Sequence, residues 1–155
     1  MDIIGHQLIA ADRATVWSHL IAADTLQACI PGCETITGSL DTGFDAVVAQ
    51  KVGPLRVRFR GRLEISEIVP LAGYRIRGAG GGGLAGHAGG DALVRLHDHA
   101  DGTRLSYGLD VTAGGRLARL GTGVIHGFAE RMIATYFETF RGVVEAGGGN
   151  GDRAR

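Results

Sequence analysis

The clearest pattern in the chain is an alternation of apolar and basic residues over positions 55–65, LRVRFRGRLEI. The apolar positions share one face of an extended strand: Leu55, Val57, Phe59, Leu63 and Ile65. Four arginines take the other face: Arg56, Arg58, Arg60 and Arg62. Because successive side chains of a strand point to opposite faces, this alternation predicts a half-buried antiparallel strand.

The same period of two recurs along the chain. It predicts further strands over 3–9, 33–40, 44–51 and 73–78, and around 92–96 and 105–111. Gly53-Pro54 and Asp101-Gly102 are typical of hairpin turns between neighbouring strands. After the first strand, Asp12 is a candidate cap for a short helix over 13–21, and Asp24 for a second one that ends before Pro31.

After Gly115 the apolar spacing becomes helical, and we expect one long helix over 117–145. Its apolar stripe consists of Leu117, Ile125, Phe128, Met132, Tyr136 and Val143, widened by Ile133 and Phe140. The charged residues expected on the opposite side are Glu130, Arg131, Glu138, Arg141 and Glu145.

A sheet and a long helix bury their apolar faces most simply against each other. We therefore predict an α+β helix-grip fold, in which a curved antiparallel sheet of about six to seven strands wraps around the C-terminal helix, with two short helices after the first strand. Residues 1–146 are expected to form this single domain, and residues 147–155 a disordered, glycine-rich tail.

The stretch 78–91, GAGGGGLAGHAGGD, contains eight glycines. Its first residues have the G-x-G-x-x-G spacing of a dinucleotide-binding turn, but the residues that follow alternate like a strand instead of opening a helix. A P-loop is excluded as well, because no Gly-Lys-Ser/Thr sequence follows. Two interpretations remain open: a flexible hairpin, or strands without side chains that make room for a ligand or a partner surface.

Composition narrows the functional classes. The 155-residue chain has 16 basic and 16 acidic side chains, and this balance argues against nucleic acid as the main partner. The two cysteines and the lack of a signal-peptide pattern indicate a reducing, cytoplasmic location. No apolar run is long enough to span a membrane.

Metal-binding and catalytic groups are sparse. Cys29 and Cys33 have a C-x-x-x-C spacing that is unusual for zinc, and no second pair completes a set of four ligands. His97 and His99 share a strand face beside Asp101, which fits either a metal site or solvated residues at a hairpin end. We therefore assign no metal, no cofactor and no catalytic residue.

The arginines of 56–62 continue onto the next strand. Together they form the arginine stripe: Arg56, Arg58, Arg60, Arg62, Arg75 and Arg77. This stripe is a candidate docking surface for an acidic partner or for anionic lipid headgroups. The other interpretation is a solvated sheet face on which cross-strand acids such as Asp45 and Glu64 neutralise the charge.

Six segments in chain order carry a family resemblance: Val16-Trp17, CIPGCE at 29–34, VGP at 52–54, F-x-G at 59–61, G-x-A-x-x-x-A-x-V at 86–94 and GTRLSYGLDVTAGGRLARLG at 102–121. They resemble the family of the CoxG subunit of carbon monoxide dehydrogenase, within the START-like, polyketide-cyclase-like (SRPBCC) superfamily. The IPGCE and GG-x-LA-x-LG sequences are the more specific of these matches.

The resemblance implies a hydrophobic cavity between sheet and long helix, suited to a lipid or a quinone. The residues expected to contact this ligand are Trp17, Phe44, Phe59, His87, Tyr107, Phe128, Met132 and Tyr136. Either His6 or His87 could offer one polar contact to the headgroup, and the other interpretation of each is a structural histidine. The aromatic residues of the helix have a second interpretation, as ordinary core.

The resemblance further implies a non-enzymatic accessory protein of a carbon monoxide dehydrogenase-type molybdenum hydroxylase, which helps to recruit the dehydrogenase to the membrane or to its electron acceptor. We expect peripheral contact with the inner face of the cell membrane and no permanent anchor, because the chain ends nine residues after Ala146. Two alternatives stay open. One is a cyclase-like or dehydratase-like enzyme whose acid or base is a tyrosine or His6, which we expect on the apolar face of the first strand. The other is an interaction module with a closed cavity that docks through its arginine face.

Overall fold

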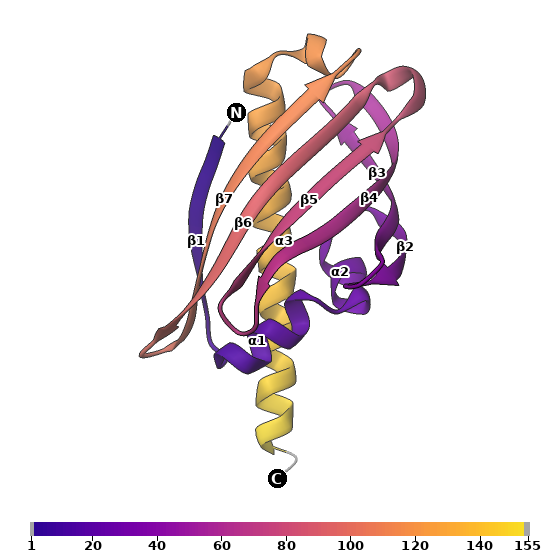
Figure 1. Ribbon diagram of the computed structural model, residues 1–155. Coiled ribbons are helices and arrows are strands. Elements are labelled where there is room, and N and C mark those ends of the chain that lie inside the picture. The colour runs from indigo at the N-terminus through magenta and orange to yellow at the C-terminus, as the bar shows by residue number, and fades with distance from the viewer. Residues whose placement is uncertain (1, 154–155) are drawn as a thin grey trace.

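In the computed structural model, one curved antiparallel sheet wraps around a long helix (Figure 1). The structure describes the backbone of residues 2–153 and the side chains of residues 2–146. The strands are β1 (Asp2–Ile9), β2 (Cys33–Ser39), β3 (Gly43–Val52), β4 (Leu55–Val69), β5 (Gly73–Gly81), β6 (His87–His99) and β7 (Gly102–Gly114). The α-helices are α1 (Arg13–Leu20), α2 (Ala23–Cys29) and α3 (Thr122–Arg153), and the short 3-10 helices are η1 (Gly83–Ala85) and η2 (Ala118–Leu120).

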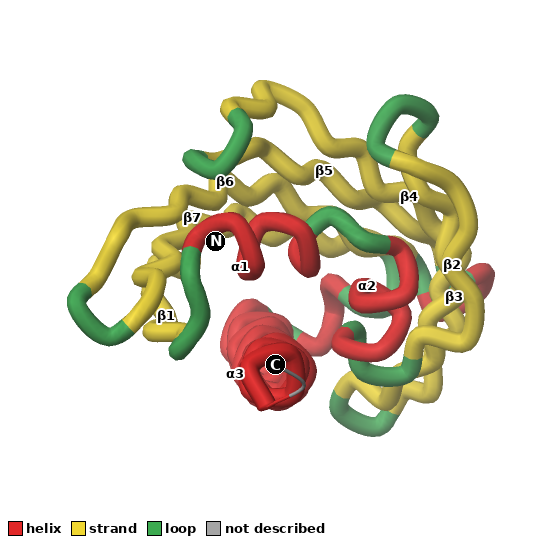
Figure 2. Tube along the Cα trace, turned by 90° about the horizontal axis from the view of Figure 1, so that it is seen from below, coloured by secondary structure: helices red, strands yellow, loops and turns green. Residues whose placement is uncertain are grey.

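The sheet confirms the predicted fold class. Its seven strands are ordered β1-β7-β6-β5-β4-β3-β2, and each neighbouring pair is antiparallel. Strands β2 to β7 follow one another as hairpins. The chain crosses from β1 at one edge to β2 at the other through α1 and α2, so these two helices cross the lower end of the curved sheet beside α3 (Figures 1 and 2).

The helix starts test the predicted caps. Asp12 caps α1 as expected, because its carboxylate accepts a hydrogen bond of 2.8 Å from the Thr15 backbone N–H. The prediction for Asp24 was wrong: Ala22 occupies the N-cap position of α2 without a side-chain hydrogen bond, and Asp24 lies in the first turn of the helix. Helix α3 begins at Thr122 instead of 117, because the chain first forms η2 and then turns at Gly121 with a positive φ of 93°.

In the C-terminal half of α3, the buried residues are not all those of the predicted apolar stripe. Val143 is 36% exposed, whereas Val144 is fully buried, so the placement of Val143 in the stripe was wrong. Two residues expected on the solvent side instead bind the sheet edge. Arg141 donates a hydrogen bond to the Gln7 side chain, and Glu145 accepts one of 2.9 Å from the Ala10 N–H.

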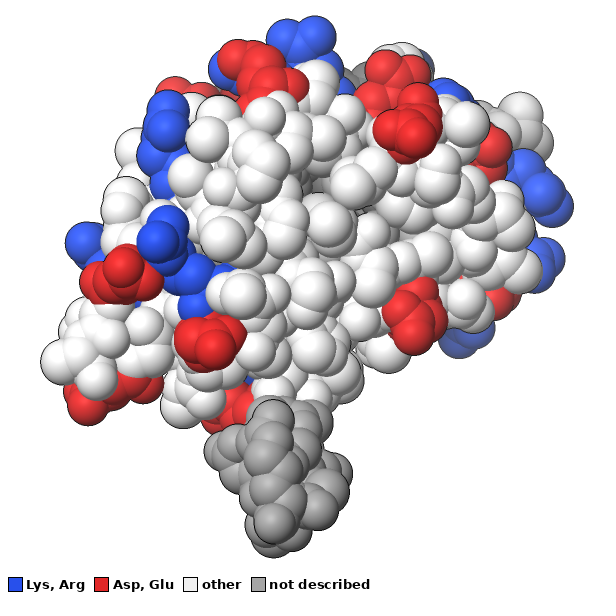
Figure 3. Space-filling view, turned by 60° about the horizontal axis from the view of Figure 1, so that its bottom comes forward, with Lys and Arg blue, Asp and Glu red and all other residues white. Residues whose placement is uncertain are grey.

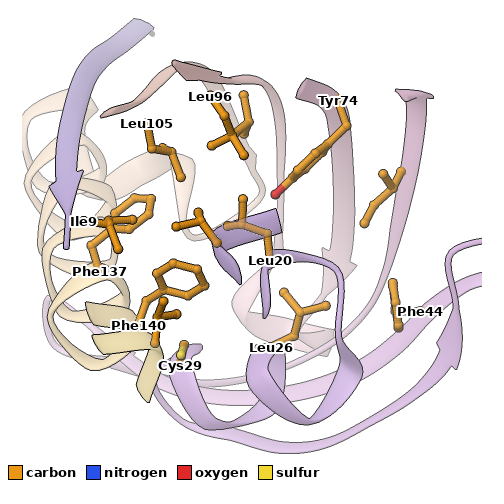
Figure 4. Close-up of a cluster of buried hydrophobic side chains, with 14 of the residues drawn as sticks. Ile9, Leu20, Leu26, Cys29, Phe44, Tyr74, Leu96, Leu105, Phe137 and Phe140 are labelled. Atoms are coloured by element: carbon orange, nitrogen blue, oxygen red, sulfur yellow. The ribbon is translucent and has the colours of Figure 1, made fainter. Parts of the chain in front are cut away.

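Side chains fill the two ends of the space between sheet and helix. At the α1–α2 end, a large cluster joins the short helices to α3 and the sheet, and includes Ile9, Val16, Leu105 and Phe140 (Figure 4). In Figure 3, which brings this end forward, charged side chains lie mainly toward the rim. At the η2 end, a small cluster consists of Val52, Val57, Leu117 and Ile125. The helix is therefore supported at both ends of the curved sheet.

We predicted a disordered tail over residues 147–155. The structure describes only the backbone of residues 147–153, as the end of α3, and residues 154–155 lie outside the described chain. The disorder of this tail stays a prediction.

The large cluster should dominate stability. We expect Leu105→Ala to lower the free energy of unfolding by about 3 kcal/mol, because Leu105 is 0% exposed and its removal leaves a cavity among close-packed neighbours. Leu84→Ala is the matched control: Leu84 is 89% exposed, and its loss should change stability by less than about 0.5 kcal/mol. Urea denaturation followed by circular dichroism measures both, and equal effects would contradict this description of the core.

Candidate functional site

The glycine run forms part of a bare patch on the concave face of the sheet. One row of paired residues crosses from β3 to β7 and contains only small side chains: Ala46, Gly61, Gly80, Ala88 and Ala113. In the adjacent row, Gly78 and Gly90 lie between Leu63 and Val111. Because directly paired residues point to the same face, the two rows leave the middle of this face almost without side chains.

Helix α3 covers this bare patch with Phe128 and Met132, which are one helical turn apart. Since α3 is supported at both ends, a hollow of about 350 Å³ remains between the helix and the sheet. We call it the cavity. A smaller hollow of about 210 Å³ extends it toward η2 and shares Phe128 and Met132. This volume is in the range of small-molecule sites.

The cavity wall is made largely of carbon. Its apolar side chains are Ile30, Ala46, Val48, Phe59, Leu63, Ile76, Ala88, Ala92, Leu109, Phe128 and Met132. Only Gln50 and Arg62 contribute polar side chains to the lining residues, and both are engaged elsewhere. Gln50 donates to the Pro31 carbonyl oxygen, and the Arg62 guanidinium binds acidic residues on the outer face of the sheet.

The structure separates the two interpretations of the glycine run. Gly78, Gly80 and Gly90 belong to regular strands, so the hairpin between β5 and β6 is confined to the residues around η1. A larger residue would not fit at the neighbouring Gly61, because a Cβ added there would lie only 2.7 Å from the Ala79 carbonyl oxygen. The glycines of β5 and β6 lie in regular strands, and the cavity lies directly above them. This arrangement fits the interpretation that the missing side chains make room for a ligand.

Three of the residues expected to contact a ligand lie on the cavity wall: Phe59, Phe128 and Met132. The others lie elsewhere. Phe44 is buried in the large cluster, and Trp17 packs edge-to-face on Tyr74 with ring centroids 5.8 Å apart. His87 is exposed at the start of β6, with its ring over Gly114.

The two remaining tyrosines pack within the large cluster. Tyr107 stacks on Phe137 at 5.6 Å, and its hydroxyl lies over Gly5 of β1. Tyr136 stacks on Phe140 at 5.8 Å. Neither is part of the cavity wall, and whether they contact a ligand stays a prediction.

Sequence reasoning missed most of the wall, including Ile30, Val48 and Ala92. For the small residues a signal was present. Extending the period of two from Tyr74 and Ile76 places Gly78 and Gly80 on the inner face. For Ile30 no such signal exists, because its position depends on how α2 ends against the sheet.

His6, the histidine named as acid or base for the enzyme alternative, does not lie in the interior. His6 is exposed on the outer face of β1, so its placement on the apolar face was wrong. The thiols are poor nucleophiles, because burial raises the pKa of both Cys29 and Cys33. Among the described residues, no three His, Cys, Asp or Glu side chains gather as metal ligands would.

The arginine stripe lies on the outer face of β4 and β5, and acidic neighbours bind most of it. Arg62 pairs with Asp45 at 3.1 Å and with Glu64 at 3.3 Å, as one interpretation expected. The other ion pairs are Arg58 with Glu34, Arg75 with Glu67 and Asp91, and Arg77 with Asp91. Within the described chain, Arg56 and Arg60 form no ion pair.

Asp91 links the two arginines of β5 from the adjacent strand. It accepts from Arg75 at 2.8 Å and from Arg77 at 3.1 Å. The hydrogen bond from Arg75 is the main reason that the pKa of the Asp91 carboxyl lies below its usual value. The outer face is therefore held together by charge, while the inner face is left apolar.

A curved sheet gripping a helix over an apolar hollow defines the class of START-like helix-grip proteins. Solved structures share the fold. A conserved protein from Geobacillus kaustophilus aligns with a TM-score of 0.87 and 22% identity over 94% of this chain and 96% of that one. A protein from Thermus thermophilus aligns with a TM-score of 0.67 and 13% identity over 95% of this chain and 99% of that one. The protein Ara h 8.0201 aligns with a TM-score of 0.68 and 13% identity over 94% of this chain and 98% of that one.

The sequence matches the family of the CoxG subunit of carbon monoxide dehydrogenase over residues 5–145, and the chain belongs to this family. Among curated proteins, no sequence matches it.

None of the helices in the described part of the chain combines the length and the hydropathy needed to cross a membrane.

The charge network of the outer face should depend on pH through Asp91. Its lowered pKa means that the ionised carboxylate stabilises the fold at neutral pH, and that this contribution is lost as the pH falls below about 4. We expect Asp91→Asn to lower the Tm by a few degrees at pH 7 and to have little effect near pH 2. Asp41→Asn, in the exposed turn between β2 and β3, is the control. Equal Tm differences at both pH values would contradict the role given to Asp91.

Proposed function

We propose that this protein is a non-enzymatic carrier that holds a lipophilic molecule, a lipid or a quinone, in the cavity between its sheet and α3. The observation that carries this proposal is the pair of bare rows beneath Phe128 and Met132. They keep about 350 Å³ of apolar space open between two clusters of buried side chains. Protein interiors are normally close-packed, so a preserved hollow of this size calls for an occupant.

The physical basis of binding is the transfer of apolar surface out of water. An apolar guest gains roughly 25 cal/mol for each Å² that it buries, and the carbon wall sets no strict demand on its shape. Such binding needs no catalytic group, which agrees with the outward position of His6 and the raised pKa of both thiols.

The family match supports a proposal for the partner as well. We propose that the protein works in the cytoplasm beside a carbon monoxide dehydrogenase-type molybdenum hydroxylase, and that it meets its lipophilic guest at the inner face of the cell membrane. The family description supports the partner. Of the arginine stripe, Arg56 and Arg60 are the residues best placed to bind an acidic partner, because the other four are already paired.

The direct test is extraction. Purified protein treated with organic solvent should release a lipophilic compound, detected by mass spectrometry in an amount comparable to the protein. Repeated extraction without any such compound, from protein prepared without detergent, would count against a carrier.

Filling the cavity should abolish binding. Ala88 lines both hollows, and Ala88→Phe would place a ring in the space that the guest needs. We expect the amount of extracted compound to fall at least tenfold. Ala134→Phe, on the exposed side of α3, should leave it unchanged. Circular dichroism checks that both variants fold, and equal retention of the guest by the two variants would refute the cavity as its site.

Docking is tested separately. Combined replacement of Arg56 and Arg60 by alanine should reduce co-purification of molybdenum-hydroxylase subunits with the tagged protein several-fold, because charges that are free of ion pairs are removed. The control is Arg58→Ala together with Arg77→Ala, which removes arginines that already have acidic partners. A larger loss in the control would place the docking surface elsewhere.

A further inference from the structure

The sheet has two edge strands, and only one of them is protected against pairing with another chain. At the β2 edge, the register with β3 shifts between Cys33 and Thr35. The Gln27 side chain of α2 also covers this edge, where it donates a hydrogen bond of 3.1 Å to the Glu34 carbonyl oxygen. Bulges, charges and covering elements prevent edge strands from pairing with other chains. In β1, by contrast, the register with β7 is unbroken, and residues 3–9 contain no proline and no Lys, Arg, Asp or Glu.

The main chain of β1 has unused hydrogen-bonding groups. In an antiparallel ladder, every second residue of an edge strand points its N–H and C=O away from the neighbouring strand. Figure 1 shows β1 at the margin of the sheet, with β7 as its neighbour on one side. Outside this ladder, the main chain of residues 2–8 forms no hydrogen bond to another described residue, whereas the Ala10 N–H is already bound by Glu145. The free part of the edge is therefore the segment 2–8, which is centred on Gly5.

The outer face beside this edge exposes two apolar side chains. Ile4 is 86% exposed and Leu8 is 44% exposed. On β7, the residue paired with Ile4 is Gly108, which has no side chain to cover it. An added strand would bury both apolar side chains and would pair the free main-chain groups of β1 at the same time. The edge therefore has the properties of a strand-pairing surface.

Charges at the two ends of β1 indicate which strand fits this edge. On the outer face, Asp2 lies at one end, and Arg104 of β7, which pairs with Leu8, lies at the other. Both charged side chains are exposed, and neither has an ion pair within the described chain. A second copy of β1, added antiparallel, brings the acidic end of each copy to the basic end of the other. The edge is thus complementary in charge to itself.

We propose that two copies of this chain pair antiparallel through β1 and form a symmetric dimer, with its two-fold axis at Gly5. This register uses the whole free segment 2–8. Because directly opposite residues share a face, the outer face of one copy continues into that of the other. Asp2 lies opposite Leu8 of the second copy, in the row that also contains Arg104 of that copy. The arginine stripes of both copies lie on the same side of the joined sheet, so the dimer presents two docking surfaces in one direction.

Sedimentation velocity of the full chain, between about 1 and 100 μM, tests the dimer. We expect a species with twice the 16.1 kDa mass of one chain. Ile4→Lys should raise the dissociation constant of the dimer at least tenfold, because it places a charge in the paired face. Leu84→Lys is the matched control: Leu84 is 89% exposed in η1, at the β5–β6 hairpin, and its replacement should leave the dissociation constant unchanged. Circular dichroism checks that both variants fold.

A charge exchange tests the register. Asp2→Arg alone and Arg104→Asp alone each place like charges at both contacts between the copies, so each variant should dimerise at least tenfold more weakly than the wild-type protein. An equimolar mixture of the two variants should form dimers again, because both contacts then join opposite charges. A merely structural role of either residue within one copy would not produce this rescue.

Hydrogen exchange locates the contact, because main-chain amides of residues 2–8 should exchange more slowly at the highest protein concentration than at the lowest. The proposal is overturned by a monomer at every concentration, by a dimer that Ile4→Lys leaves intact, or by a mixture of the two charge variants that stays monomeric. A different protein bound at β1 in place of a second copy would overturn it as well. None of these outcomes bears on the carrier function, which concerns the cavity within one copy.

Discussion

The structure depends on one constraint of antiparallel pairing: residues directly opposite each other on adjacent strands point to the same face. Small residues placed in register on β3 to β7 therefore add up to continuous rows without bulk. A helix would normally settle onto such a surface. Here α3 cannot, because Phe140 at one end and Ile125 at the other already rest on filled clusters. The size of the hollow is therefore set by the distance between the two clusters that hold α3 and by the strand register that aligns the small residues between them.

This arrangement divides the molecule into parts with separate tasks. The α1–α2 end holds most of the buried side chains and should determine stability. The middle is left open and apolar. The outer face carries the arginine stripe, most of it paired with acids, so that the curved sheet presents little net charge there. This combination of a stable frame and an apolar interior supports the proposed carrier function.

The sequence predicted the sheet well because alternation is a local property. In residues 55–65 the alternation of apolar and basic residues identifies the buried face of the strand, and no contact with a distant segment is needed to recognise it. The start of α3 was less clear, because a helical spacing of apolar residues continues through η2 and hides the turn at Gly121. His6 was misplaced for a similar reason. Strand β1 has apolar residues on both faces, with Ile4 86% exposed, so its sequence pattern does not show which face is buried.

The cavity was harder to predict than the fold. Sequence reasoning selected large aromatic residues as its wall, but large side chains tend to fill space, and Phe44 and Trp17 pack into the core. The wall depends instead on what is missing at Gly61, Gly80 and Gly90. The glycine run was noticed, yet its meaning required the register between β4, β5 and β6, which no single segment contains.

Xenon tests the central claim most directly, because it binds preformed apolar hollows without needing any specific contact. A crystal structure of ligand-stripped protein under xenon pressure should show xenon between Phe128 and the small residues Gly80 and Gly90. If α3 instead lies directly on those glycines and the space holds no xenon, the open middle does not exist and the account built on it is contradicted.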